Sequence, residues 1–451
     1  MNIFSFFMNN TVLFLLIFTP YIYGKTSELL CVIEFNRHGA RTAKTFKSKT
    51  LSKVFGDQMI LTPNGFRQHE VLGQFIKNKY IKEIPFIKDD YDSSKFEIFT
   101  TPIQRTISSA IAFVNGFYPN SVVKMKYQNS STLSDIISND TIPFQTASSF
   151  HYEEVPIEVF SKVNDFFHRS DCSYKGEVLK DKIMKESENQ VIFNISKMNL
   201  TEVTIELSKF LNVEIPEDND DIENGNYLAD LEKYLQSFLY HYGKNLDDPK
   251  LSKELAQLIK MKMINKKYFY RIQDSKYLRI LTSEIFINIL QKFENSIFDE
   301  NQRKISVYFA HDTNLMNILT NLIQNDKIKE YLIKALDDQE YYNLVFPPYA
   351  SSLLFELYKR NNNYYVNINF NGRLIDKDFK YINDDKIVNS EIKYEDFKFM
   401  LMQLIEKDYK QLVCDGEYVD KLSIEAMRSS YGRKVKKDYT RHFLKKPKKR
   451  S

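Results

Sequence analysis

The sequence lacks the signatures of several common enzyme classes. It has no Gly-X-Ser-X-Gly turn and no glycine-rich loop ending in Lys-Ser or Lys-Thr, which argues against serine hydrolases and nucleotide kinases. Internal repeats and heptad patterns are also absent. The histidines outside the motifs described below show no spacing typical of a metal site: His69, His151, His168, His241 and His442. We therefore expect neither a metal ion nor another cofactor.

Positive charge is concentrated at the C-terminus. Residues 433–450 carry ten Lys or Arg and one acid, Asp438, while the whole 451-residue chain has a net charge of +4. The rest of the chain is therefore mildly acidic. No basic stripe interleaved with aromatic residues occurs there, so we expect no nucleic-acid partner. We interpret residues 421–451 as a solvated basic tail, with contact to an anionic surface as the alternative.

Charged side chains are absent before Lys25, and a compact apolar run spans residues 12–18. This pattern resembles a signal peptide at residues 1–24. The alternative is an uncleaved anchor, but residues 9–10, both Asn, leave a stretch shorter than the roughly 20 residues that a membrane helix needs. No later segment is apolar enough to span a bilayer. We expect a secreted or lysosomal protein without a stable membrane span.

Four acceptor motifs for N-glycosylation support entry into the secretory pathway. Their asparagines are Asn129, Asn139, Asn194 and Asn199.

Cysteine is scarce, with only Cys31, Cys172 and Cys414. If a bridge forms, one cysteine stays unpaired. Cys31 lies in an apolar, strand-like run, which favours a buried free thiol. Cys172 and Cys414 are then the candidate disulfide, and one bridge is compatible with an oxidising compartment.

Short apolar runs alternate with helical patterns along the chain. Strand-like runs occur at 29–35, 96–99 and 305–310, a hairpin or edge pair at 353–358 and 365–370, and helical spacing at 62–80, 228–239 and 278–293. This alternation predicts an α/β domain with a mainly parallel central sheet flanked by helices. We assign residues 25–119 and 275–420 to this core. Residues 120–274 have few strand signals and are predicted to form a mostly helical inserted cap.

Polar residues follow three of the predicted strands directly. Residues 37–41 (RHGAR) place Arg37 and Arg41 on either side of His38, and guanidinium groups match phosphate oxygens. His311 and Asp312 follow the strand at 305–310, where Asp312 can act as a general acid or as a helix N-cap. His311, if protonated, adds positive charge.

Arg105 lies just past the strand at 96–99, in or near the first turns of a helix, where anions are favoured. Each of these motifs also has a plainer interpretation as solvated side chains in a loop or on a helix. The carboxyl ends of parallel strands meet at one edge of a sheet, however, so the three groups are expected to converge.

In this arrangement the sequence resembles the histidine acid phosphatases, a branch of the histidine phosphatase superfamily. The block at 32–43 is similar to the family signature Arg-His-Gly-X-Arg-X-Pro, with Ala43 in place of the last Pro. Further similar blocks occur in the same order at 61–73, 104–110, 308–313 and 347–357. Cys172 and Cys414 also resemble one family disulfide, although other family cysteines are missing.

The resemblance implies a role for each matched position. His38 would be the nucleophile that forms a phosphohistidine, and Asp312 would protonate the leaving alcohol before water hydrolyses the phosphoenzyme. The residues expected to hold the phosphate are Arg37, Arg41, Arg105 and His311.

The resemblance leaves the substrate open. A broad acid phosphatase is favoured by the acidic body of the chain, and the partner is then a small phosphomonoester. The alternatives are a phytase or other inositol-phosphate phosphatase, a lipid- or sugar-phosphate phosphatase, and a catalytically silent relative that binds a phosphorylated ligand. All six site residues are present, which argues against the silent relative. A homodimer is left open.

Overall fold

The structure is a computed structural model that describes residues 27–42, 59–127, 153–160, 205–206, 208–210, 252–273, 275–299, 301–375, 379–380, 387–388 and 391–407. Several sequence predictions lie outside these ranges: the signal peptide at 1–24, the helix at 228–239, the four glycosylation motifs, Cys172 with Cys414, and the basic tail.

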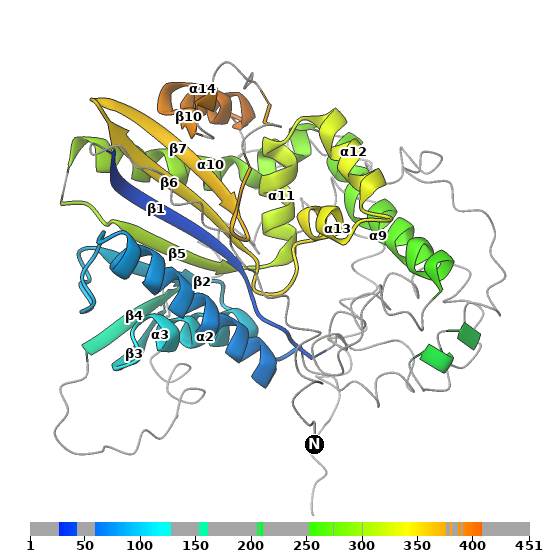
Figure 1. Ribbon diagram of the computed structural model, residues 1–451, viewed down its shortest axis with the longest axis horizontal. Helices are drawn as coiled ribbons and strands as arrows, with labels where there is room; N and C mark the ends of the chain where they lie inside the picture. Colours follow the sequence, from blue (N-terminus) through cyan, green and yellow to red (C-terminus); the bar gives the residue numbers. More distant parts are fainter. Residues whose placement is uncertain are drawn as a thin grey trace, which may run out of the picture.

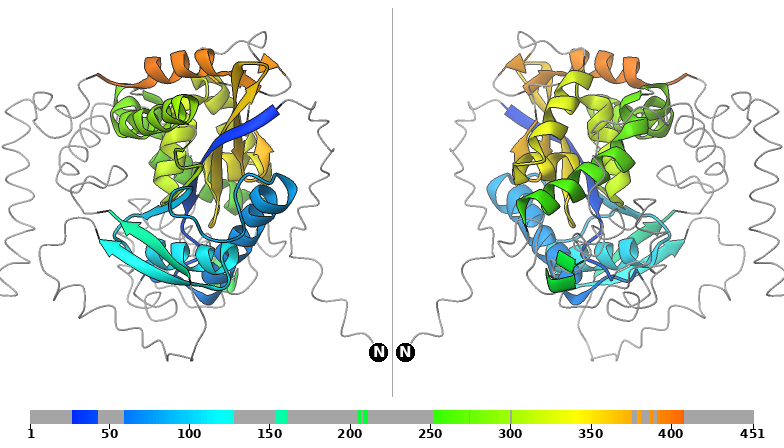
Figure 2. Two further views of the ribbon diagram at one scale, coloured as in Figure 1. Left: turned by 90° about the vertical axis from the view of Figure 1, so that its left-hand side faces the viewer. Right: turned by 90° about the vertical axis from the view of Figure 1, so that its right-hand side faces the viewer.

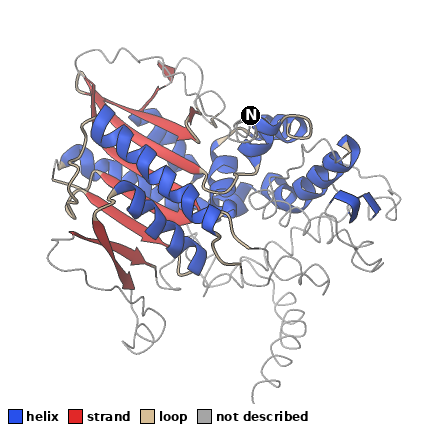
Figure 3. Ribbon diagram, turned by 60° about the horizontal axis from the view of Figure 1, so that its bottom comes forward, coloured by secondary structure: helices blue, strands red, loops and turns tan. Residues whose placement is uncertain are grey.

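A ten-stranded mixed sheet runs through the described part of the molecule (Figures 1 and 3). Its strand order is β3-β4-β2-β5-β1-β6-β7-β10-β9, and β8 pairs with β7 beside this path. The strands are β1 (Ser27–Arg37), β2 (Phe96–Thr100), β3 (Ser121–Tyr127), β4 (Glu153–Val159), β5 (Ile305–Ala310), β6 (Ser352–Arg360), β7 (Asn363–Phe370), β8 (Arg373–Leu374), β9 (Ile387–Val388) and β10 (Glu391–Lys393).

The sheet is parallel from β3 to β1 and antiparallel from β1 to β9. The predicted hairpin is confirmed as β6 and β7, but β6 pairs directly with β1 and does not lie at an edge. The sheet is therefore mixed where a mainly parallel one was expected. A short polar turn at 361–362 joins β6 to β7, and so short a connection enforces antiparallel pairing.

β3 and β4 extend the sheet from within the segment 120–274, which was expected to be mostly helical. β4 pairs with β2 in parallel, and β3 continues the sheet beyond it. In β4, Val155 and Ile157 are buried while Glu154 is exposed, and Pro156 interrupts the run of β-forming residues. Such alternation is a weaker sequence signal than the continuous apolar runs of β1 and β5.

Helices cover both faces of the sheet (Figures 1 and 2). They are α2 (Pro63–Lys77), continued by a π-helical turn η1 (Asn78–Glu83), then α3 (Gln104–Phe117), α9 (Lys253–Gln273), α10 (Ser275–Phe298), α11 (Asp312–Leu322), α12 (Asn325–Lys334), α13 (Gln339–Val345) and α14 (Tyr394–Leu404). α2 and α3 lie on one face, and α10, α11 and α14 lie on the other. α9, α12 and α13 form a group beside α11.

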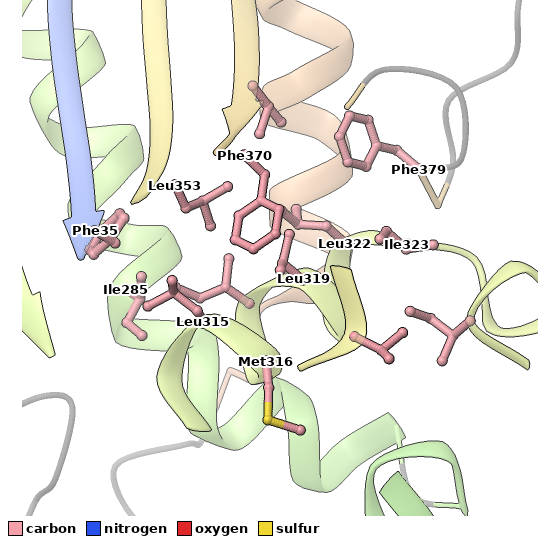
Figure 4. Close-up of a cluster of buried hydrophobic side chains, with 14 of the residues drawn as sticks. Phe35, Ile285, Leu315, Met316, Leu319, Leu322, Ile323, Leu353, Phe370 and Phe379 are labelled. Atoms are coloured by element: carbon pink, nitrogen blue, oxygen red, sulfur yellow. The ribbon is translucent and has the colours of Figure 1, made fainter. Parts of the chain in front are cut away.

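Each face of the sheet has its own hydrophobic cluster. Ile33 and Phe35 of β1 pack toward α10 and α11, and Figure 4 shows Phe35 beside labelled side chains of α10, α11 and β6. Val32 belongs to the second cluster, under α2 and α3. Successive side chains of a strand point to opposite faces, so β1 is buried on both and reads as a continuous apolar run.

Cys31 is a buried free thiol, as expected from its place in β1, and burial raises its pKa to about 11. Among the residues that the structure describes, no helix is long and apolar enough to cross a membrane.

Candidate active site

The loop after β1 is anchored to the neighbouring strands by its backbone. The His38 N–H donates to the Ala310 carbonyl at the end of β5, and the His38 carbonyl accepts from the Ala350 N–H. β2, β5 and β1 are adjacent and parallel, so the residues that follow them lie at one edge. The predicted convergence of the three motifs is thus present in the fold.

His38 is held in one tautomer. Its Nδ1 lies 2.8 Å from the Gly39 carbonyl oxygen, which can only accept, so Nδ1 carries the proton. Nε2 then has a free lone pair, and it makes no hydrogen bond to the described residues. Burial, the charge of Arg105, the neighbouring His311 ring and the charges of Arg37 and Arg41 hold the pKa of His38 well below its usual value. The imidazole is therefore a neutral potential nucleophile even in mildly acidic solution.

The three predicted arginines gather around this imidazole. Arg37 and Arg41 are buried, and Arg105 is partly buried. Their charges act on one another, and burial together with Arg41 lowers the pKa of Arg105 to about 10. The Nε atoms of Arg41 and Arg105 are buried without a hydrogen-bond partner in the described structure. Buried guanidinium groups with unused donors form a site that an anion would complete.

His311 links Arg105 to the end of β2. Arg105 donates to His311 Nδ1 over 3.1 Å, which places the His311 proton on Nε2, 3.2 Å from the Thr101 hydroxyl. The ring is thus neutral in this arrangement, and the positive charge that a protonated His311 would add is not present. Its centroid lies 5.4 Å from that of His38.

Asp312 is the first residue of α11, directly after His311, which is the N-cap of the helix. The N-cap alternative considered for Asp312 thus applies to His311. Asp312 Oδ2 lies 3.9 Å from Nζ of Lys267 in α9, and its side chain is 34% exposed. Burial opposes ionisation of Asp312, but the charges of Lys267 and Arg37, together with the adjacent rings of His38 and His311, hold its pKa well below the usual value.

The segment that precedes β6 covers Arg37. The Arg37 guanidinium donates to the Pro347 carbonyl and lies 4.1 Å from the centre of the Tyr349 ring. Tyr349 also lies beside His38, with ring centroids 5.7 Å apart. These contacts fix the orientation of Arg37 at the base of the site.

The start of α2 packs against the loop that follows β1 and supports it. The Thr62 side chain caps the helix at Gly65 N–H and donates to the Ala40 carbonyl. A Cβ atom on Gly39 would lie 2.3 Å from the Gly65 carbonyl oxygen, so only glycine allows this approach. Further along α2, His69 donates through Nε2 to the Arg37 carbonyl.

All six residues predicted for the site are close together, whereas the predicted disulfide and glycosylation residues lie outside the described chain. The sequence motifs do not predict a role for Lys267, Tyr349 or Thr101, or the supporting role of His69. Tyr349 and His69 lie in the blocks at 347–357 and 61–73 that resemble the family. Lys267 lies in a segment without a recognisable motif. Among the described residues, no group of three or more His, Cys, Asp or Glu side chains is arranged to hold a metal ion.

Among proteins similar in sequence are two mammalian prostatic acid phosphatases. Bovine prostatic acid phosphatase is 24% identical over 79% of this chain and 81% of its own length. Rat prostatic acid phosphatase is 26% identical over 76% of this chain and 78% of its own length.

Among solved structures, the phytase of Citrobacter braakii aligns with a TM-score of 0.55 at 14% identity, covering 85% of this chain and 99% of the phytase. The multiple inositol polyphosphate phosphatase of Bifidobacterium longum aligns with a TM-score of 0.54 at 12% identity, covering 85% of this chain and 93% of the phosphatase. At such identity these alignments establish the α/β fold.

A family model matches residues 47–371, which is more than half of the chain. The matched span contains the Arg105 and His311-Asp312 motifs, and it begins just after the His38 loop. The chain belongs to the histidine phosphatase superfamily, branch 2.

Proposed function

We propose that the protein is a metal-independent acid phosphatase that hydrolyses phosphate monoesters through a phosphohistidine at His38. The observation that carries this proposal is the neutral imidazole of His38, buried among Arg37, Arg41 and Arg105 with its Nε2 lone pair unused. Family membership and the prostatic acid phosphatase relatives support the same reaction.

Binding of the substrate would use positive charge that the protein already holds in place. The phosphate dianion accepts hydrogen bonds from the guanidinium groups of Arg37, Arg41 and Arg105. The N-termini of α3 and α11 also begin at the site and favour an anion there. Since these cations balance the charge of the transferring phosphoryl group, the chemistry requires no metal ion.

In the first step, the Nε2 lone pair of His38 forms a bond to phosphorus as the ester P–O bond breaks. Asp312 transfers its proton to the departing alcohol oxygen. The Nδ1–H of His38 remains bonded to the Gly39 carbonyl, which stabilises the positive charge that develops on the ring. Asp312 is ionised in the substrate-free protein, so it must first take up a proton. A bound phosphate dianion promotes this step because it offsets the surrounding cations.

In the second step, water attacks the phosphohistidine. The Asp312 carboxylate accepts a proton from that water as its oxygen bonds to phosphorus and the N–P bond breaks. His38 regains its lone pair and Asp312 is again protonated; when inorganic phosphate leaves, Asp312 releases this proton to solvent and returns to its ionised state.

We favour a broad range of monoester substrates because the sequence relatives are acid phosphatases. An inositol-phosphate substrate is the second candidate, and the phytase structures support it only through the shared fold. We further propose that the protein enters the secretory pathway, with N-glycosylation and a Cys172–Cys414 bridge. The buried free thiol of Cys31 supports that pairing, because it leaves the other two cysteines available.

The proposal is tested by hydrolysis of para-nitrophenyl phosphate between about pH 4 and pH 8 with EDTA present, comparing the purified chain with His38→Ala. Chelator-resistant turnover at acidic pH that disappears in the variant supports it. Absence of turnover in folded wild-type protein, with para-nitrophenyl phosphate and inositol hexakisphosphate alike, would contradict it.

A further inference from the structure

Helix α9 reaches the candidate active site from a part of the chain that carries no recognised motif. Two buried contacts fix its C-terminal half. Arg271 Nε donates to the Asn317 side chain of α11 over 2.7 Å, and the Tyr268 hydroxyl donates to the Val345 carbonyl at the end of α13. α9 is thus joined both to the helix that begins with Asp312 and to the segment leading to Tyr349.

Lys267 lies in this fixed part of α9. Its carbonyl accepts a hydrogen bond from Arg271, and its ammonium group lies 3.9 Å from the Asp312 carboxylate. The two side chains are 21% and 34% exposed, so both are partly withdrawn from solvent. The pair connects residues that are 45 positions apart and belong to different helices.

Several other charged or titratable groups act on Asp312. Arg37 and His38 come from the end of β1, His311 precedes Asp312 in the chain, and Arg105 comes from α3. All of these also belong to the proposed phosphate site, so a bound phosphate offsets the charge of the two arginines. Lys267 differs because it comes from α9 and is paired with the carboxylate itself.

We propose that Lys267 is a positioning residue, which holds the Asp312 carboxylate in place and sets the pH range in which Asp312 can protonate the leaving alcohol. This inference rests on the proposed function, in which Asp312 is the general acid. A cation near a carboxylate favours its ionised form, so Lys267 makes Asp312 a stronger acid. A stronger acid transfers its proton more readily, but it is protonated only at lower pH.

Removal of this cation has a consequence that depends on the leaving group. An alkoxide is a poor leaving group and needs the proton of Asp312, whereas para-nitrophenolate needs it little. kcat/KM covers only the steps up to departure of the alcohol, so it reports this proton transfer and not the later attack by water. The ionisation of the substrate also affects kcat/KM, but it is the same for every variant.

The test is the pH dependence of kcat/KM for glycerol 2-phosphate and para-nitrophenyl phosphate in wild type, Lys267→Gln and Lys267→Arg. With glycerol 2-phosphate, Lys267→Gln should move the alkaline limb upward by about half to one pH unit. This shift corresponds to roughly three- to tenfold higher kcat/KM at a fixed pH on that limb. The shift should be smaller with para-nitrophenyl phosphate, and Lys267→Arg should retain the wild-type limb.

Lys253→Gln is the matched control, because Lys253 lies on the same helix and pairs with Asp337 at 3.0 Å in an exposed position. It should leave both profiles unchanged. Lys267→Met provides a second uncharged variant of similar length, and thermal unfolding checks that each variant folds. The inference would be overturned if the alkaline limb of the kcat/KM profile for glycerol 2-phosphate were the same in wild type, Lys267→Gln and Lys267→Met. Failure of the wild-type protein to hydrolyse either substrate would instead count against the proposed function.

Discussion

His38 combines features that oppose each other in free histidine. A free imidazole is largely protonated in acidic solution and then cannot attack phosphorus. Here burial and the neighbouring arginines lower the pKa of His38, so its neutral form persists at acidic pH. Arginine is suited to this task because its charge does not titrate in the working range. At acidic pH, where Asp312 can take up a proton, His38 is thus still neutral and able to attack a phosphate that the arginines hold.

His69 supports the loop after β1, and its contribution to the free energy of unfolding depends on pH. Burial lowers its pKa from 6.5 to about 3, so the folded protein keeps it neutral where the unfolded chain protonates it. The stability contributed by neutral His69 is therefore present above about pH 6.5 and is lost progressively as the pH falls. At pH 4.5 the loss amounts to about 2–3 kcal/mol.

Substitution of His69 by Gln should reduce this pH dependence, because the amide can still donate to the Arg37 carbonyl and does not titrate. The measurement is the free energy of unfolding by urea at pH 7 and pH 4.5. Glu34, whose pKa is raised to about 7 by burial, contributes with the opposite sign. Its effect is common to both proteins and cancels in the comparison. Equal losses in wild type and variant would show that His69 titrates normally.

The contact between α2 and the catalytic loop depends on closely approaching backbones. A Cβ on Gly65 would lie 2.1 Å from the Ala40 carbonyl oxygen. Gly65→Ala should therefore displace the loop, lower the free energy of unfolding by about 1–3 kcal/mol, and reduce kcat/KM by about tenfold or more.

Gly73→Ala is the matched control, because its Cβ would lie 2.2 Å from the Phe113 carbonyl oxygen, in the contact between α2 and α3. It should destabilise the fold to a similar extent and leave kcat/KM near the wild-type value at temperatures where the variant is folded. A Gly65→Ala variant with wild-type kcat/KM would show that the loop does not depend on this contact.

The elements that could be predicted from sequence are those with a local signal. β1, β2 and β5 are short apolar runs, and α2 begins with the N-cap Thr62 followed by Pro63, as predicted. β3 and β4 were missed because their polar residues alternate with apolar ones. The six site residues could be grouped because parallel strands bring them to one edge. Lys267 could not, since its contact with Asp312 depends on how α9 packs against α11.

At the scale of the whole molecule, the sheet carries the candidate site at one end and, at the other, a charge cluster in which the carboxylate is buried and its cationic partners are partly exposed. Glu97, near the start of β2, pairs with Lys292 and Arg303 and accepts from Ser306. Burial opposes its ionisation, but these partners hold the pKa of Glu97 below the usual value.

Glu97→Gln would leave the two partly exposed cations without their carboxylate and should lower the free energy of unfolding by about 1–3 kcal/mol. The change in kcat/KM should be small, because Glu97 lies near the start of β2 and the candidate site lies at the other end of this strand, after Thr100. Glu154→Gln, which breaks the exposed pair with Lys124, should cost less than about 1 kcal/mol. Urea unfolding compares the two variants. Equal stabilities would mean that the Glu97 cluster does not hold the sheet together.

The most direct test of the account is to trap the phosphoenzyme. Wild type, His38→Ala and Asp312→Asn are mixed with para-nitrophenyl phosphate, quenched in alkali, and analysed by mass spectrometry of their peptides. We predict phosphate on His38 in wild type and more of it in Asp312→Asn, because the amide cannot assist the attack of water. None is expected on the corresponding peptide of His38→Ala. Phosphate on another residue, or turnover by wild type with no phosphoenzyme in either His38-containing protein, would contradict the assignment of His38 as the nucleophile.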